Sequence, residues 1–279
     1  MDRRRFLQGA ALGAAAALPL LRTTRAEAAS DIKIKRVRVF NATDKSSMAG
    51  PIGLSELIVA VDTDSGVTGY GQGGTADLLR FASSLLIGQD ALRTEYLWQR
   101  MYRTSIYPAG RERLMAVGAL DCALWDIKGK VMNQPVYELL GGRARDHVEC
   151  YHSFGGMRRE QAKELARKSV EEGYRAIRFH TVPTEDNLKF DARRMIDLFV
   201  AVSAELREGL GKDGDFIVDA HTRFDLADAA RLCDLVAPYS PLFVEDPLHT
   251  IDDYTLFTAL RRRVNVPLAA GEQFGDLRD

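Results

Sequence analysis

From about His147 to the last residue, apolar strand-like runs alternate with amphipathic helical patterns. The expected strands are 148–153, 176–180, 216–219, 242–245 and 267–272, and the expected helices lie near 160–172, 187–208, 225–236 and 252–263. Such alternation predicts an α/β fold of parallel strands with covered faces. The repeat is typical of a β/α barrel or of an open doubly wound sheet. Because no glycine-rich dinucleotide fingerprint follows any strand, an open nucleotide-binding sheet has no support.

The segment before it, residues 29–146, follows a different pattern and is predicted to be a separate α+β domain. Residues 32–40 alternate apolar and polar side chains, which is the period of a half-buried strand. Residues 57–61 and 67–70 are the two arms of an expected hairpin. A helix then follows, and its apolar face consists of Ala116, Leu120, Leu124, Ile127 and Val131.

Residues 1–28 resemble a secretory signal. Three arginines, Arg3 to Arg5, precede Phe6-Leu7, an apolar run extends from Gly9 to Leu21, and small residues occupy a cleavage pattern at 26–28. The arginines followed by Phe-Leu are similar to the twin-arginine signal, which predicts export to the periplasm or beyond. The alternative is a frayed, alanine-rich amphipathic helix. No stretch reaches the ~20 apolar residues of a membrane span.

The composition narrows the class of partner. With 38 basic and 39 acidic side chains the formal charge is −1, and this balance gives no electrostatic case for a nucleic-acid partner, which would need a strongly basic face. Hydrophobic residues make up 46%, which excludes intrinsic disorder. The three cysteines, Cys122, Cys150 and Cys233, lie in apolar runs without paired spacing, so they are predicted to be buried free thiols.

Each of the last three expected strands leads to an acidic residue: Asp219, Glu245 and Glu272. The C-terminal ends of barrel strands form the active-site face, and adjacent strands lie about 4.8 Å apart. Three carboxylates that close need a cation, and oxygen-only ligands suit Mg²⁺. A single acid after a strand is more often a helix cap or a solvated loop residue. Three acids spaced at 26 and 27 residues favour a metal site.

The chain resembles the enolase superfamily, in its mandelate racemase/muconate lactonizing enzyme branch. The resemblance rests on the run Ala119-Leu-Asp-Cys-Ala-Leu-Trp-Asp-Ile-Lys-Gly-Lys130, on Val-Asp219, on Val-Glu245-Asp-Pro and on Gly-Glu272-Gln. It implies a capping domain over 29–146, a modified TIM-like barrel from 147, and one essential Mg²⁺. It also implies removal of the proton α to a substrate carboxylate, which gives an enediolate that the metal stabilises.

Arg178 and His180 stand where many members of this branch carry a Lys-x-Lys pair. The arginine could hold a substrate carboxylate or neutralise developing negative charge, because it is always protonated. The histidine could exchange a proton near neutral pH. A strand-end ion pair for Arg178 and a capping hydrogen bond for His180 are the structural alternatives. The pair is predicted to be catalytic, and the departure puts a lysine base in doubt.

His221 lies two residues beyond Asp219, so on a continued strand its side chain would face the same way. The Asp-x-His pattern resembles that of acid-sugar dehydratases, in which the histidine protonates the departing 3-hydroxyl. Hydroxide is a poor leaving group, so its loss needs an acid. The predicted reaction is therefore dehydration of a sugar acid to a 2-keto-3-deoxy acid. The alternative for His221 is a residue that orients a metal-binding carboxylate.

A complete barrel of this type takes roughly 250 residues and eight strands. Residues 147–279 hold five recognisable strands, so we expect an incomplete barrel and a C-terminally truncated chain. Three hypotheses stay open: an exported Mg²⁺-dependent dehydratase seen as a fragment, a racemase or cycloisomerase of the same branch, and a non-catalytic remnant. The remnant would fold only with a partner or with another copy of itself, and a homo-oligomer is expected.

Overall fold

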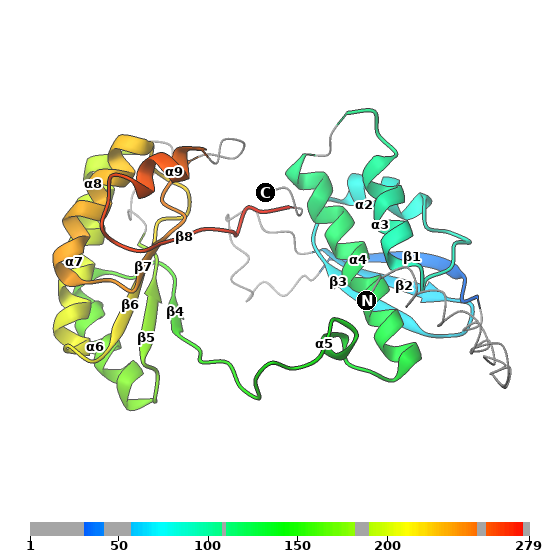
Figure 1. Ribbon diagram of the computed structural model, residues 1–279, viewed down its shortest axis with the longest axis horizontal. Helices are drawn as coiled ribbons and strands as arrows, with labels where there is room; N and C mark the ends of the chain where they lie inside the picture. The colour runs from blue at the N-terminus through cyan, green and yellow to red at the C-terminus, as the bar shows by residue number, and fades with distance from the viewer. Residues whose placement is uncertain (1–30, 42–56, 108–109, 182–189, 250–254, 276–279) are drawn as a thin grey trace, which may run out of the picture. The chain divides into compact units, whose positions relative to one another are not determined.

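The computed structural model describes residues 31–41, 57–107, 110–181, 190–249 and 255–275 (Figure 1). Contacts divide the chain after Gly142 into two compact units, here called the α+β unit and the barrel unit. The predicted domain boundary was placed a few residues later, after Asp146. The predicted signal, residues 1–28, lies outside the described residues. No helix within the described ranges is long and apolar enough to cross a membrane.

The α+β unit is an antiparallel three-stranded sheet with helices. The strand order is β1-β2-β3. Its elements are β1 (Ile34–Asn41), β2 (Leu57–Thr63), β3 (Thr68–Gln72), α2 (Ala76–Ser84), α3 (Thr94–Arg103), α4 (Arg111–Met132) and α5 (Val136–Leu139). All three predicted strands and the predicted long helix are present.

Strand β3 lies directly on the backbone of helix α4. A side chain at Gly71 would place its Cβ 1.9 Å from the carbonyl oxygen of Ala119, and one at Gly69 would place it 2.0 Å from that of Ala123. Only glycine permits this approach. The Asp126 carboxylate accepts a hydrogen bond of 2.9 Å from the backbone N–H of the strand residue between the two glycines. The Ala-rich run of α4 is therefore a packing surface for β3.

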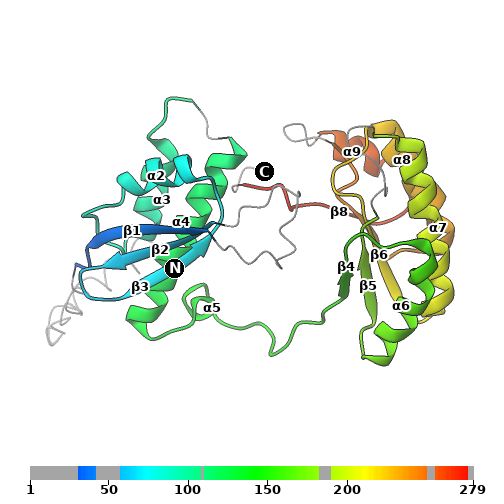
Figure 2. The same cartoon turned by 180° about the vertical axis from the view of Figure 1, so that it is seen from behind.

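The barrel unit is a parallel sheet whose strands follow the order of the chain, β4-β5-β6-β7-β8. Its elements are β4 (His152–Phe154), α6 (Arg159–Glu171), β5 (Ala176–Phe179), α7 (Ala192–Leu210), β6 (Asp215–Asp219), α8 (Leu226–Val236), η1 (Ala237–Tyr239), β7 (Phe243–Glu245), α9 (Thr255–Arg261) and β8 (Leu268–Ala269). Helices α6, α7 and α8 lie along one face of the sheet (Figures 1 and 2).

This sequential order decides between the two predicted architectures. Right-handed crossovers that each add the next strand on the same side leave all helices on one face, as in a barrel. A doubly wound sheet reverses its strand order and places helices on both faces. The described residues thus form five adjacent strands of a β/α barrel, and the predicted incomplete barrel is confirmed.

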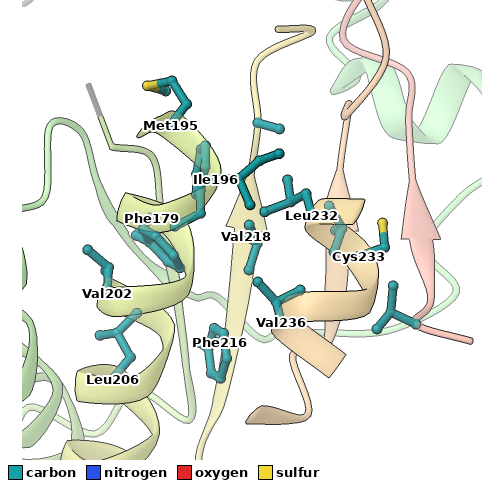
Figure 3. Packing of buried hydrophobic residues seen from close by; sticks show 14 of the residues in the cluster. Phe179, Met195, Ile196, Val202, Leu206, Phe216, Val218, Leu232, Cys233 and Val236 are labelled. Atoms are coloured by element: carbon teal, nitrogen blue, oxygen red, sulfur yellow. The ribbon is translucent and has the colours of Figure 1, made fainter. Parts of the chain in front are cut away.

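Alternate strand residues fill the space between this sheet and its helices (Figure 3). Phe179, Phe216 and Val218 are fully buried there, and the Phe179 ring lies 5.8 Å from the ring of Phe199 on α7. Because side chains alternate along a strand, their neighbours Arg178 and Asp219 face the other side of the sheet. Because the apolar side chains of these strands pack against the helices, Arg178 and Asp219 face the barrel interior.

The cysteine prediction is only partly correct. All three cysteines are free, but Cys233 alone is buried, whereas Cys122 and Cys150 are exposed. Cys122 lies on a side of α4 that faces away from the core. Cys150 precedes β4 and lies outside any helix or strand. Apolar sequence neighbours therefore did not imply burial at these two positions.

Candidate active site

The C-terminal edge of the parallel sheet brings two of the predicted acidic residues together. Asp219 ends β6 and Glu245 ends β7, and they are direct partners in the parallel register. The next backbone hydrogen bond, 3.0 Å from the Ala220 N–H to the Glu245 carbonyl oxygen, extends the pairing past the strand ends. Asp219 is only 1% exposed, so its carboxylate needs a compensating charge.

Arg178, on the neighbouring strand β5, supplies that charge. Its Nη2 group forms an ion pair with the Asp219 carboxylate. The same nitrogen lies 2.7 Å from Nε2 of His221, and Nη1 donates to the Ser153 hydroxyl at 3.3 Å. Arg178 is thus fixed on three sides at the strand end where the sequence placed it, and it connects β4, β5 and the segment after β6.

His221 reaches the site by a turn and not along a continued strand. Strand β6 ends at Asp219, and His221 and Thr222 both have positive φ angles, of 45° and 56°. The expectation that His221 lies on the strand is therefore wrong, although its side chain does face Asp219. Its Nε2 atom is 2.9 Å from the Asp219 carboxylate, and its backbone N–H donates to the same carboxylate at 3.0 Å. Burial, followed by the charge of Arg178, lowers the pKa of His221.

His180 is buried beneath His221. The two rings stack with centroids 3.8 Å apart and planes 26° apart. His180 Nδ1 lies 3.1 Å from the backbone carbonyl oxygen of Asp219, and a carbonyl only accepts, so Nδ1 carries a proton. Burial, together with the charges of His221 and Arg178, lowers the pKa of His180 to about 3. The expectation of proton exchange near neutral pH is therefore not supported, because the ring stays neutral.

Glu272 does not join Asp219 and Glu245 in one ligand cluster. Strand β8 ends at Ala269, three residues earlier than predicted, and the chain then turns at Gly271, whose φ is 142°. Glu272 lies exposed in that turn. Among the residues that the structure describes, no group of three or more His, Cys, Asp or Glu side chains is placed to hold a metal ion. The Asp219 carboxylate is turned toward Arg178 and His221.

Glu245 nevertheless carries the mark of a cation ligand. Its Oε2 atom is buried and has no hydrogen-bond partner within the described part of the chain. Burial raises the pKa of Glu245, and the nearby charges of Asp246 and Glu272 raise it further against the opposing effect of Arg178. A buried carboxylate oxygen without a donor fits a hard divalent cation, since carboxylate oxygens are its preferred ligands. This oxygen of Glu245 therefore suits a divalent cation.

Asp246 is a further buried acid at this edge that was not predicted from the sequence to be a site residue. It is 2% exposed and sits with a positive φ of 38° directly after Glu245. The sequence signal that could have identified it is the Glu-Asp-Pro run. Asp246 follows the acid at the end of the strand and precedes a proline, which restricts the backbone of the residue before it.

Two family models match the chain. The N-terminal domain of mandelate racemase/muconate lactonizing enzyme matches residues 50–141, and the enolase C-terminal domain-like model matches residues 161–279. Together they span most of both units and agree with the α+β and barrel architectures described above.

Individual relatives support the same assignment. A D-galactonate dehydratase of Xanthomonas oryzae pv. oryzae is 36% identical over 227 residues, covering 78% of this chain and 58% of the relative. The D-galactonate dehydratase of Pectobacterium atrosepticum is 35% identical over 224 residues, with the same coverage of 78% and 58%. The chain therefore spans under two thirds of the length of these relatives.

Solved structures show the same fold. A protein from Agrobacterium radiobacter, described as an enolase and putative galactarate dehydratase with bound Na and L-malate, superposes with a TM-score of 0.72 at 32% identity. The match covers 87% of this chain and 62% of that one. An enolase from Pantoea ananatis with bound D-gluconate and Mg gives a TM-score of 0.73 at 25% identity, covering 88% and 67%. The chain therefore belongs to the enolase superfamily, in its mandelate racemase/muconate lactonizing enzyme branch.

Proposed function

We propose that the barrel unit carries the active site of a Mg²⁺-dependent dehydratase that converts a sugar acid to a 2-keto-3-deoxy acid. The observation that carries the proposal is the position of His221, held against Asp219 and Arg178 at the C-terminal edge of the sheet. An acid beside a carboxylate-binding centre is what loss of a β-hydroxyl requires. The names of the relatives, D-galactonate dehydratases, support the same reaction.

Asp219, Glu245 and Glu272 are the residues that would hold the metal ion. When bound, Mg²⁺ supplies positive charge to the carboxylate oxygens of the substrate as the proton on C2 leaves. The unpartnered Oε2 atom of Glu245 supports this assignment. For Asp219 to bind the metal ion, its carboxylate must separate from Arg178. A substrate carboxylate is a suitable alternative partner for the Arg178 guanidinium.

Arg178 would bind the substrate carboxylate, and His221 would act as the acid at C3. A general base, a role that we assign to none of the described residues, takes the proton from C2. The electron pair of the broken C2–H bond forms a double bond between C2 and C3, the C3–O bond breaks, and Nε2 of His221 gives its proton to the departing hydroxyl, so that water leaves. The resulting enol tautomerises to the 2-keto-3-deoxy acid. A substrate carboxylate on Arg178 would offset the positive charge that lowers the pKa of His221. His180, stacked below, would keep the His221 ring in place.

The substrate class is proposed from the relatives. Their printed names and ligands are D-galactonate, galactarate and D-gluconate, all six-carbon sugar acids with hydroxyls at C2 and C3. We expect one such acid to be dehydrated in the presence of Mg²⁺ and not after removal of divalent ions with EDTA. A panel of six-carbon aldonates and aldarates, assayed for 2-keto-3-deoxy product, tests this.

Exchange of His221 for asparagine separates the two steps of the reaction. His221→Asn should abolish dehydration but leave exchange of the C2 proton with D₂O largely intact, measured by proton NMR. His147→Asn, a change at an exposed histidine outside the site, is the matched control. If dehydration survives in His221→Asn, this residue is not the acid. If the unchanged chain epimerises C2 without losing water, the racemase hypothesis replaces the dehydratase.

The metal assignment has its own test. Glu245→Gln should lose Mg²⁺ affinity and activity together, measured by calorimetric titration. Asp234→Asn, at an exposed acid on α8, should change neither. Undiminished Mg²⁺ binding in Glu245→Gln would contradict the assignment.

We also propose export of the chain through the twin-arginine pathway, supported by the arginines before Phe6-Leu7 and by the small-residue pattern at 26–28. Intact mass of the protein from a periplasmic fraction should correspond to cleavage after Ala28. Replacing Arg3 and Arg4 by lysine should retain the precursor in the cytoplasm, and unchanged export would contradict the proposal.

A further inference from the structure

Asp246 occupies a position in the barrel unit that is demanding for a residue with a side chain. It is 2% exposed and has a φ of 38°, in the left-handed region that Asp and Asn tolerate better than most other non-glycine residues. Burying a carboxylate is costly unless donors surround it. We therefore expect hydrogen-bond donors close to the Asp246 carboxylate.

The backbone of Asp246 joins the turns on both sides of β7. Its N–H donates to the carbonyl oxygen of Ala269 at the end of β8, with a distance of 3.0 Å. Its carbonyl oxygen accepts from the N–H of Thr222, at 2.6 Å, in the left-handed turn that carries His221. One residue thus fixes both neighbouring strands just beyond their ends.

The side chain of Asp246 extends this link to the turn that carries Glu272. The backbone N–H groups of Gly271 and Glu272 face this carboxylate and stabilise its charged form. No strand ladder is available to those two N–H groups, since β8 ends at Ala269. The Oδ2 atom of Asp246 is buried and has no hydrogen-bond partner among the described residues. Among the described residues, the donors that this carboxylate faces are therefore the backbone N–H groups of the Glu272 turn.

We propose that Asp246 is a positioning residue that sets the Glu272 turn against Glu245 and the His221 turn, so that the three elements keep one arrangement. This inference rests on the proposed function, because Glu272 can bind the proposed metal ion only if its turn is held at the sheet edge. Asp246 itself need touch neither metal nor substrate. Residues that orient metal ligands typically change metal affinity by 10–100-fold when replaced, about the effect expected here.

Amide hydrogen exchange tests whether the N–H groups of Gly271 and Glu272 hydrogen-bond to the Asp246 carboxylate, in the full chain and without metal. The N–H groups of Gly271 and Glu272 should exchange at least about tenfold more slowly than in an unstructured peptide, although Glu272 is exposed. Asp246→Gly keeps the left-handed backbone accessible and removes only the carboxylate, so it should abolish this protection. The Thr222 N–H, which bonds to the backbone of residue 246, should stay protected. Absence of protection in the unchanged chain would overturn the proposal without any variant.

Binding of Mn²⁺, followed by electron paramagnetic resonance, tests the positioning role. Asp246→Gly should weaken Mn²⁺ binding about tenfold or more, whereas Asp246→Asn, which keeps an acceptor oxygen, should recover most of the affinity. Asp234→Asn is the exposed control. Faster exchange at Glu272 with unchanged Mn²⁺ affinity would show a purely structural role and overturn the proposal.

The same titration separates this inference from the proposed function. If Glu245→Gln leaves Mn²⁺ binding unchanged, the proposed metal site fails. If Glu245→Gln weakens binding and Asp246→Gly does not, the metal site stands and the role of Asp246 fails.

Discussion

Replacing Asp121 by asparagine should stabilise the α+β unit, and the gain should grow as the pH rises. Asp121 lies half-buried on α4, within the Ala-rich run that packs against β3. Burial, with a smaller contribution from the charge of Glu95 on α3, raises its pKa from 3.8 to about 6. Folding therefore favours the protonated carboxyl, and ionisation of Asp121 opposes folding.

The sign and size follow from linkage. An acid whose pKa is raised by folding contributes its stability below its unfolded pKa, and this stability is lost as the pH rises through about 6. The difference between the unfolded and folded pKa of Asp121 corresponds to about 3 kcal/mol of lost stability at pH 8 and only about 0.6 kcal/mol at pH 4. Solvent screening at a half-buried position reduces both values, so we expect Asp121→Asn to gain about 1–2 kcal/mol at pH 8.

Fluorescence reports on this unit alone, because both tryptophans of the chain, Trp98 and Trp125, belong to it. Urea unfolding followed by tryptophan emission at pH 4.5, 6 and 8 gives the free energy of unfolding of each variant. Glu112→Gln, at an exposed acid in the first turn of α4, should give no stabilisation at any of these values. A gain from Asp121→Asn that is the same at pH 4.5 and pH 8 would refute the reasoning.

Three further predictions concern packing and positioning. Gly71→Ala should destabilise the α+β unit by about 3 kcal/mol in the same assay, because its Cβ would meet an α4 carbonyl, whereas Gly118→Ala meets nothing within 4 Å and should be tolerated. Arg207 donates to four backbone carbonyls around the base of α7, so Arg207→Lys should lower the free energy of unfolding of the barrel unit by about 2–4 kcal/mol, measured by circular dichroism. His180→Phe should preserve the ring-current shift of the His221 Cε1 proton in NMR spectra, and His180→Asn should abolish it.

Local sequence patterns were sufficient where an element lies between two neighbours. Strand β6 and helix α8 were predicted almost to the residue, since β6 is hydrogen-bonded on both sides and Asp225 caps α8 by accepting from the N–H of Asp228. Strands β4 and β8 are shorter than predicted. Each has a single neighbour in the described sheet, so its ladder ends where that neighbour ends. Residue types along a strand carry no information about the length of its partner.

The local course of the chain after Asp219 could not be predicted. Alternation along a strand predicted that the His221 side chain lies beside Asp219, and in the structure it does. The backbone, however, does not continue as a strand, because two consecutive residues in the left-handed conformation bend the chain. Non-glycine residues seldom adopt that conformation by themselves. Here the N–H of Thr222 bonds to the carbonyl of Asp246, directly after another strand, β7. The turn depends on a tertiary contact that no window of sequence contains.

The two histidines of the site show why residue type does not settle a chemical role. His180 and His221 start from the same intrinsic pKa, and each follows the C-terminal end of its strand, β5 or β6, at the predicted active edge. Burial and a carbonyl partner keep His180 neutral, so it can support a neighbouring ring but not exchange protons near neutral pH. His221 faces one cation and one carboxylate, Arg178 and Asp219, so its protonation depends on where those two charges are engaged. A substrate that binds Arg178 changes that balance at His221, whereas burial, the largest cause of the low pKa of His180, does not depend on Arg178. The proposed acid is therefore the histidine whose surroundings a substrate can alter.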